Sequence, residues 1–326
     1  MLPAVYIIGC GGTIAGRAAS QSELIGYQAG EVSIDDLIQS VPQMTDYASI
    51  RGEQFCNIDS SSMTEELLLQ LARHVQDVAD RDDVDGIVIT HGTDTMDETA
   101  YFLHLTVHTH KPVVLVGAMR PATAISADGP MNLLEAVRLA ATPRAGEYGV
   151  LQVMNSTICS ARFMEKTDTT HVHTFTDGQL GALGFMQDGV PVFYQKPLRR
   201  HTYDSRWTCP AEDHLPPVWI LYCHIGMTAA IIETAMERGI QGMVLAGMGH
   251  GNLPKHLLPV IKEAQLKGLV FVRATRASGG IVSPVPLWPH MIGADNLSPQ
   301  KARLLLQLAL QETSDVEQIQ RWFGEY

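Results

Sequence analysis

The sequence has few features of a membrane-spanning, nucleic-acid-binding or disulfide-stabilised protein. No apolar run approaches the roughly 20 residues that a helix needs to span a bilayer. Asp and Glu number 35 against 23 Lys and Arg. The resulting net charge of -12 argues against a nucleic acid partner, which requires a basic face. The five cysteines are widely spaced without a Cys-x-x-Cys pair, which favours reduced, mostly buried thiols over a disulfide framework.

The beginning of the chain does not resemble a signal peptide. The stretch Met1–Ile8 lacks a positively charged segment and a small-residue cleavage site, and leads directly into an apolar run. With the unpaired cysteines, this predicts a cytoplasmic protein. The protein would be periplasmic if the sequence shown lacks an upstream leader.

Landmarks of several common enzyme classes are also missing. There is no Gly-x-Ser-x-Gly sequence, the usual landmark of a serine-triad hydrolase. The glycine-rich stretch 9–16 has Ile14 where a dinucleotide fingerprint needs glycine, and Arg17-Ala18 where a P-loop needs Lys-Ser or Lys-Thr. Two His-x-His pairs have no further ligand at zinc-like spacing, so we expect exposed or hydrogen-bonded histidines at 108–110 and 171–173.

The sequence does contain a regular alternation of short apolar runs and helical patterns. Buried parallel strands are predicted at 5–8, 86–90, 112–117 and 149–154, and again after the polar stretch that ends in Pro216-Pro217. The alternation predicts an α/β fold. Its mostly parallel sheets would form a larger N-terminal domain over 1–194, a linker over 195–217 and a smaller C-terminal domain over 218–326.

Two threonine-containing stretches follow predicted strands. The first is Gly11–Gly16, in which glycines surround Thr13. It fits either a tight turn without chemistry or a nucleophile beside an anion-binding nest. The second is Thr90–Thr99, in which Thr93 and Asp94 lie in a turn at the end of a strand. A helix-capping role for Asp94 is an equally good interpretation.

Two further stretches are ambiguous by themselves. Residues 117–121 lead through Asp128, a candidate helix cap, into a helix. Lys166 lies in a polar loop, where a lone lysine is normally solvated. It would matter only if the fold brought it against Asp94.

Taken together, these stretches resemble the bacterial L-asparaginase family, including its asparaginase–glutaminase members. The residues Gly11–Gly16 are similar to the first signature of that family, and Thr90–Met96 to the second. The likeness continues through much of the chain, at 117–121, 126–130, 166–170, 247–252 and 299–311. It implies a flavodoxin-like N-terminal domain, a smaller parallel C-terminal domain and a homotetramer built from intimate dimers. No metal or organic cofactor is required.

The resemblance also implies roles for individual residues. Thr13 is similar to the nucleophile that attacks the side-chain amide of L-asparagine, and Tyr27 to a tyrosine on a loop that closes over the site. Lys166, with Thr93 and Asp94, matches a second catalytic group in which the lysine accepts a proton through the threonine. Positions that hold the substrate match Ser60, Ser61, Thr93, Asp94, Ala118 and Asn252, the last contributed by a neighbouring subunit.

The sequence departs from the secreted members of that family at the group expected to hold the substrate amine. Those members have Gln or Glu where Ser61 stands, and a glutamate from the neighbouring subunit where a gapless match places Ser283. Between Arg276 and Ala294 this chain has no Asp or Glu. His250 replaces a common Asn. We therefore expect weak binding of asparagine.

The main hypothesis is an asparaginase that acts in asparagine catabolism, and two alternatives to it remain open. One is an amidohydrolase of the same fold acting on glutamine or another small amide. The other is a non-catalytic amino-acid binder, although binding alone does not need two threonines and a lysine.

Overall fold

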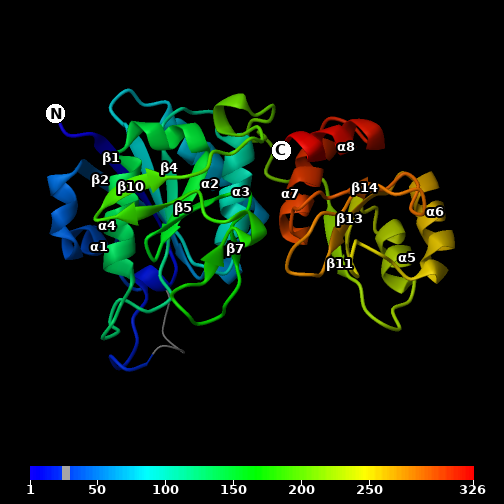
Figure 1. Cartoon of the computed structure of the whole chain (residues 1–326), viewed down its shortest axis with the longest axis horizontal. Helices are drawn as coiled ribbons and strands as arrows, with labels where there is room; N and C mark the ends of the chain where they lie inside the picture. Colours follow the sequence, from blue (N-terminus) through cyan, green and yellow to red (C-terminus); the bar gives the residue numbers. More distant parts are fainter. Residues whose placement is uncertain (24–29) are drawn as a thin grey trace. The chain divides into compact units, whose positions relative to one another are not determined.

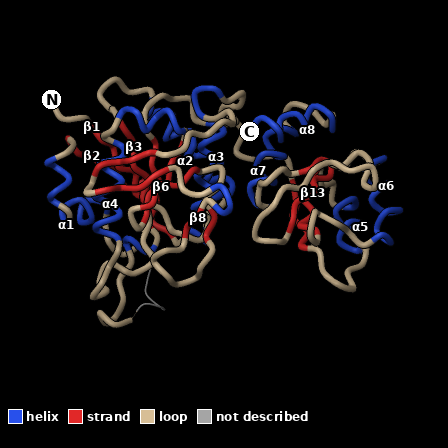
Figure 2. Tube along the Cα trace, in the orientation of Figure 1, coloured by secondary structure: helices blue, strands red, loops and turns tan. Residues whose placement is uncertain are grey.

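The structure is a computed structural model that describes residues 1–23 and 30–326. The chain divides into two compact units, Met1–Asp213 and His214–Tyr326 (Figure 1). Each unit contains its own sheet and its own helices (Figure 2). The predicted α/β class, with a larger N-terminal and a smaller C-terminal domain, is confirmed.

The first unit is built on an eight-stranded sheet in the order β10-β9-β6-β5-β4-β3-β1-β2. Pairing is parallel from β2 to β5 and antiparallel from β5 to β10. A separate antiparallel pair joins β7 and β8. The strands are β1 Ala4–Gly11, β2 Ser49–Ile58, β3 Gly86–Thr90, β4 Val113–Val116, β5 Val150–Met154, β6 Thr157–Ser160, β7 Glu165–Lys166, β8 Phe175–Thr176, β9 Gly184–Gln187 and β10 Val190–Phe193.

The parallel part of this sheet has the order 2-1-3-4-5, which is that of flavodoxin-like folds. In such a sheet the chain reverses its direction of winding between β1 and β3. Ligands bind beyond the carboxyl ends of the strands at that switch point. The two threonine-containing stretches follow β1 and β3, so the fold places both of them there.

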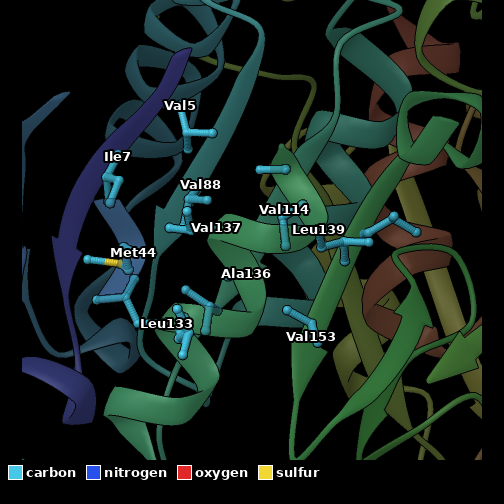
Figure 3. Packing of buried hydrophobic residues seen from close by; sticks show 14 of the residues in the cluster. Val5, Ile7, Met44, Val88, Val114, Leu133, Ala136, Val137, Leu139 and Val153 are labelled. Carbon is cyan, nitrogen blue, oxygen red and sulfur yellow. The ribbon is translucent and has the colours of Figure 1, made fainter. Parts of the chain in front are cut away.

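Helices cover both faces of the sheet, which explains why its central parallel strands β1, β3, β4 and β5 are almost wholly apolar. Val88 and Val114 pack with Leu133 and Val137 of α4 in the main core (Figure 3). The neighbouring Ile87 points to the opposite face because side chains alternate along a strand, and there α2 and α3 contact β3 and β5. The helices are α1 Ile34–Ser40, α2 Glu65–Ala79, α3 Met96–Thr106 and α4 Gly129–Ala140.

The segment 195–213, within the predicted linker, belongs to the first unit. His108 of the loop after α3 contacts the Trp207 carbonyl through Nε2 at 2.9 Å. The Cys209 thiol lies 3.4 Å from the Leu69 carbonyl of α2. Ring stacking between His110 and Tyr203, with centroids 4.3 Å apart, adds a further contact. The segment is therefore attached to α2 and to the loop after α3 of this unit.

The second unit has a four-stranded, wholly parallel sheet in the order β11-β12-β13-β14. Its core includes Met243, Leu245 and Phe271 from the sheet and Ile261 from a covering helix. The elements are β11 Val218–Tyr222, α5 Ala230–Glu237, β12 Gly242–Gly247, α6 Leu258–Leu266, β13 Val270–Thr275, β14 Ile292–Gly293, α7 Pro299–Leu310 and α8 Val316–Glu325.

Two findings bear on the expectations from composition. Within 1–23 and 30–326, no helix has the length and apolar character needed to cross a membrane. All five cysteines are free: Cys10, Cys159 and Cys223 are buried, and Cys56 and Cys209 are half-buried.

Candidate active site

Thr13 follows β1 directly and begins a short 3₁₀ turn, Thr13–Ala15. The two residues before it, Gly11 and Gly12, have φ angles of 88° and 80°. Residues with a Cβ rarely adopt this conformation, so the glycines allow the strand to turn sharply and present the threonine. Thr13 is buried, with 7% of its surface exposed.

The loop that carries Thr13 packs against the loop that carries Thr93. A Cβ atom on Gly12 would collide with the Cα and N atoms of Gly92. A Cβ atom on Gly92 would in turn lie 2.6 Å from Oγ of Ser60. The glycines of both signatures therefore let three backbone segments, after β1, β2 and β3, approach one another at the switch point.

Lys166 reaches this place from β7. Its Nζ donates to Oγ1 of Thr93 at 2.9 Å and to Oδ1 of Asp94 at 2.6 Å. The Lys166 side chain is 20% exposed and that of Asp94 54%, so the ion pair lies at the edge of the protein surface. The fold brings Lys166 to two adjacent candidates, Thr93 and Asp94, that lie more than 70 residues before it in the sequence.

The contact also decides between the two interpretations of Asp94. A capping residue would precede α3 and accept from its first N–H groups, but Thr95 holds that position. The Asp94 carboxylate instead pairs with Lys166. Asp94 is therefore not the cap of α3.

Ser60 links the turn after β2 to the second threonine loop. Its Oγ accepts from the Asp94 N–H at 3.1 Å, and its carbonyl accepts from Thr95 Oγ1 at 2.8 Å. The neighbouring Ser61 is exposed, and its N–H donates to the Asp59 carboxylate at 3.2 Å. Ser60 thus lies among the candidate catalytic residues, with Ser61 beside it on the surface.

Ala118 is fully buried in the loop after β4. The carboxylate of Asp128 fixes this loop by accepting from the Met119 and Arg120 N–H groups, each at 2.9 Å. The side-chain amide of Asn132 donates to the Gly117 carbonyl at 3.0 Å. Asp128 does occupy the position before α4, but its side chain makes no capping bond to that helix. Asp128, the expected helix cap, instead stabilises the loop that contains Ala118.

His91 is a buried residue of the second signature for which no role was predicted from the sequence. Its Nδ1 donates to the Gly92 carbonyl at 2.7 Å, because a carbonyl oxygen can only accept. Its Nε2 therefore accepts from Thr99 Oγ1 at 3.0 Å. Burial lowers the pKa of His91, so the ring is neutral and holds the turn before Thr93 in place. The available signal was a histidine directly after an apolar strand and directly before Gly92.

Asn252 belongs to the second unit, as do His250 and Ser283, two of the positions at which the sequence departs from the secreted enzymes. The N–H of Ser283 donates to Nε2 of His250 at 3.2 Å. The buried guanidinium of Arg273 donates to the carbonyls of His250 and Gly251, each at 3.4 Å, and to that of Ser283. Arg273 therefore joins the loop that ends at Asn252 to the segment around Ser283.

Tyr27 lies outside the described residues. Among residues 1–23 and 30–326, no cluster of three or more His, Cys, Asp or Glu side chains is arranged to hold a metal ion. The His-x-His pairs contact carbonyl, aromatic and carboxylate groups: His171 lies 3.0 Å from Asp168.

This arrangement combines the elements of nucleophilic catalysis. A buried hydroxyl, that of Thr13, follows a strand on a glycine turn. A second hydroxyl in the adjoining loop contacts an amine and is next to a carboxylate. Such a set can add a hydroxyl oxygen to a carbonyl carbon and handle the proton that is released.

Comparisons with known proteins agree with this chemistry. Residues 4–199 match the family described as Asparaginase, N-terminal, and residues 217–323 match the Glutaminase/Asparaginase C-terminal domain. The chain is 43% identical over 327 residues to L-asparaginase 2 of Bacillus subtilis (strain 168), covering 100% of this chain and 87% of that protein. It is 42% identical over 329 residues to the glutaminase-asparaginase of Acinetobacter glutaminasificans, covering 99% of each.

A solved structure gives the same result. The probable cytoplasmic L-asparaginase from Campylobacter jejuni superposes with a TM-score of 0.95 at 44% identity, covering 99% of this chain and 100% of that one. Family match, full-length relatives and fold agree. The chain belongs to the asparaginase family.

Proposed function

We propose that this chain hydrolyses the side-chain amide of L-asparagine to L-aspartate and ammonia, with Thr13 as the nucleophile. Membership of the asparaginase family gives the reaction class, an amidohydrolase that acts on asparagine. The observation that carries the catalytic proposal is the contact of Lys166 with both Thr93 and Asp94, on a loop packed against that of Thr13. A binding protein has no need of this set.

In the proposed reaction, Oγ1 of Thr13 attacks the amide carbon of the substrate. A threonine hydroxyl is a weak nucleophile until a base takes its proton. The negative charge that develops on the amide oxygen needs donors, and the backbone N–H groups near Thr13 and Ala118 are suited to supply them. The amide nitrogen takes a proton and leaves as ammonia. Water then hydrolyses the ester on Thr13 and regenerates the hydroxyl.

Thr93 and Lys166 are the proposed route for protons. The Nζ atom of Lys166 contacts Oγ1 of Thr93. The proposed path for the proton that Thr13 releases therefore runs through Thr93 to Lys166.

The remaining candidates are proposed to bind substrate. Ser60, Thr93 and Asp94 hold the α-carboxylate and α-amine, with Ser61 beside them. Tyr27 covers the site. Asn252, in the second unit, would come from a neighbouring subunit. Asp94 is the one carboxylate retained from the amine-binding set of the secreted enzymes, so we propose weak binding of asparagine. A lost charge-assisted contact costs roughly 1.5–3 kcal/mol, or about tenfold to a hundredfold in affinity.

Ammonia release from L-asparagine and L-glutamine, assayed side by side with purified protein, tests the function. Turnover of asparagine ahead of glutamine supports the proposal. Preference for glutamine would favour the alternative, an amidohydrolase of the same fold that acts on glutamine. The alternative is retained because one relative is described as a glutaminase-asparaginase. Binding of either amino acid without ammonia release would identify a binder and refute the proposal.

We further propose a homotetramer built from intimate dimers, in which a dimer is the smallest active form. Sedimentation alongside the activity assay tests this, and a fully active monomer would refute it. We also propose a cytoplasmic enzyme, supported by the five free cysteines and by the description of the similar solved structure as probably cytoplasmic. Fractionation of the native cells should find the activity in the cytoplasm, and recovery from the periplasm would contradict it.

A further inference from the structure

Two cysteines outside the catalytic set face each other across β1 and β2. The register of these parallel strands pairs Gly9 with Gln54 and Gly11 with Ile58, with an irregularity in between. Cys10 is the residue between Gly9 and Gly11, and Cys56 is the middle one of the three opposite it. The irregularity therefore places the two cysteines next to each other at the end of β1.

The side chain of Cys56 reaches Cys10. The Cys56 thiol lies 3.6 Å from the Cys10 carbonyl, and a hydrogen bond between the two thiols shifts the pKa of each. The amide of Gln54 donates to the carbonyls of Gly9 at 3.0 Å and Cys56 at 2.6 Å, which holds the strands together around the pair. Neighbouring strands held in this way allow the short Cβ separation that a disulfide requires.

The two thiols differ in access and acidity. Cys56 lies on β2, the edge strand of the sheet, and is half-buried, whereas Cys10 is buried. The hydrogen bond from Cys10 lowers the pKa of Cys56, and the hydrogen bond to Cys56, together with burial, raises that of Cys10. Oxidation selects the thiol that is more acidic and more accessible. Cys56 is thus the thiol that an oxidant reaches first, and Cys10 is the resolving thiol that reacts with the oxidised Cys56.

We propose that Cys10 and Cys56 are an oxidation site at which a hydroperoxide forms a reversible disulfide that switches off the adjacent active site. The Cys56 thiolate attacks hydrogen peroxide, breaks its O–O bond and becomes a sulfenic acid, while the departing hydroxide takes a proton. The Cys10 sulfur then attacks the Cys56 sulfur, the S–O bond breaks, and water leaves with the Cys10 proton. In sum, two thiols and one peroxide give one disulfide and two waters.

The position of the pair explains the effect on activity, a part of the proposal that rests on the proposed role of Thr13. Cys10 precedes Thr13 by three residues, and Cys56 precedes Ser60 by four. Between them the Gly12 N–H donates to the Ile58 carbonyl at 2.9 Å, and a Cβ on Gly11 would lie 2.6 Å from the Ile58 nitrogen. The backbone around Gly11 and Gly12 is closely packed against Ile58. Bringing the sulfur atoms of Cys10 and Cys56 to bonding distance therefore moves the turn that holds Thr13.

The experiment treats the reduced, full-length protein with hydrogen peroxide. Peptide mapping under non-reducing conditions scores the Cys10–Cys56 linked peptide, and ammonia release from L-asparagine scores activity. We expect the linked peptide to form while activity falls by about tenfold to a hundredfold, the range for a small misplacement of a reacting group. Dithiothreitol should reverse both changes.

Two variants separate this site from general oxidation. Cys56→Ser should form no linked peptide and keep its activity under the same treatment. Cys209→Ser removes the other half-buried cysteine, whose pKa burial raises to about 11, and should behave as the parent protein. Absence of the linked peptide, or a fully active linked protein, would overturn the proposal. If the linked peptide forms but the reduced parent protein releases no ammonia, the oxidation site is supported and the proposed function is refuted.

Discussion

The backbone of Gly12 packs directly against the backbone of Gly92, so that a Cβ atom on Gly12 would overlap the Cα and N atoms of its neighbour. This contact joins the Thr13 loop to the Thr93 loop. It is made between two glycines that lie 80 residues apart in the numbering, one in each signature. The spacing of the two threonines therefore depends on the absence of a side chain at Gly12.

The first prediction follows from this contact. In Gly12→Ala the new methyl group must displace the second loop, and the φ of 80° is unfavourable for alanine. We expect the free energy of unfolding to fall by about 2–4 kcal/mol and turnover by about a hundredfold. Gly178→Ala is the matched control, because its φ is also positive at 55° but no atom lies within 4 Å. Chemical denaturation and ammonia release measure both, and equal effects of the two variants would contradict this explanation.

The second prediction concerns the proton route. Lys166→Met removes the donor to Thr93 and the partner of Asp94. We expect kcat to fall by about 10²–10⁴. Stability should change by less than about 1 kcal/mol, because the ion pair lies at the surface. Lys196→Met, which removes an exposed pair with Glu147, serves as the control and should keep full activity. Turnover by Lys166→Met within a few-fold of the parent would exclude Lys166 from catalysis.

The third prediction is a dependence of stability on pH. Burial lowers the pKa of His201 from its ordinary value of 6.5 to about 4. Below the higher value the unfolded chain binds this proton and the folded chain does not. The free energy of unfolding therefore falls as the pH falls through this window, by on the order of 3 kcal/mol from this residue.

Thermal unfolding of the parent and of His201→Gln, followed between about pH 7 and about pH 4, measures this contribution. The variant should lose less stability over that window than the parent. His214→Gln, at an exposed position, should follow the parent curve. Parallel curves for the parent and His201→Gln would show that His201 is not the group responsible.

The fourth prediction concerns the second unit. Arg273→Met should leave three carbonyl oxygens without their guanidinium donor, those of His250, Gly251 and Ser283. Of these three bonds the one to Gly251 is buried and the other two are partly buried, so we expect a loss of about 1–3 kcal/mol, the cost of one unpaired buried polar group. Arg321→Met, at an exposed helix position, should change stability by less than about 0.5 kcal/mol. Urea unfolding measures both, and similar midpoints would contradict the role of Arg273.

The sequence predicted the buried parallel strands well because burial on both faces leaves a continuous apolar run. The strand Gly86–Thr90 was predicted with the bounds that it has in the structure. The edge strand β2, Ser49–Ile58, was not predicted. Its side chains are exposed or half-buried and include Arg51, Glu53 and Gln54, so it lacks such a run. Because β2 was not predicted, the pairing of Cys10 with Cys56 was not predicted either.

The candidate site divides in a similar way. Thr13 and Thr93 could be located because each follows a predictable strand at its carboxyl end. Lys166 could be placed only through the family resemblance, because a two-stranded pairing far along the chain brings it to Thr93. Asp128 was misread as a cap because position before a helix does not reveal where a carboxylate points. Arg273 was missed because its carbonyl partners come from distant loops.

The most direct test of the account is the rate of ammonia release from L-asparagine by purified Thr13→Ala, measured against the parent protein. Thr45→Ala, whose exposed hydroxyl donates to the Pro42 carbonyl, is the control. Loss of a catalytic nucleophile predicts a fall of about 10⁴-fold or more with the fold retained by circular dichroism. A folded Thr13→Ala protein that releases ammonia within tenfold of the parent rate would contradict the assignment of Thr13 as nucleophile.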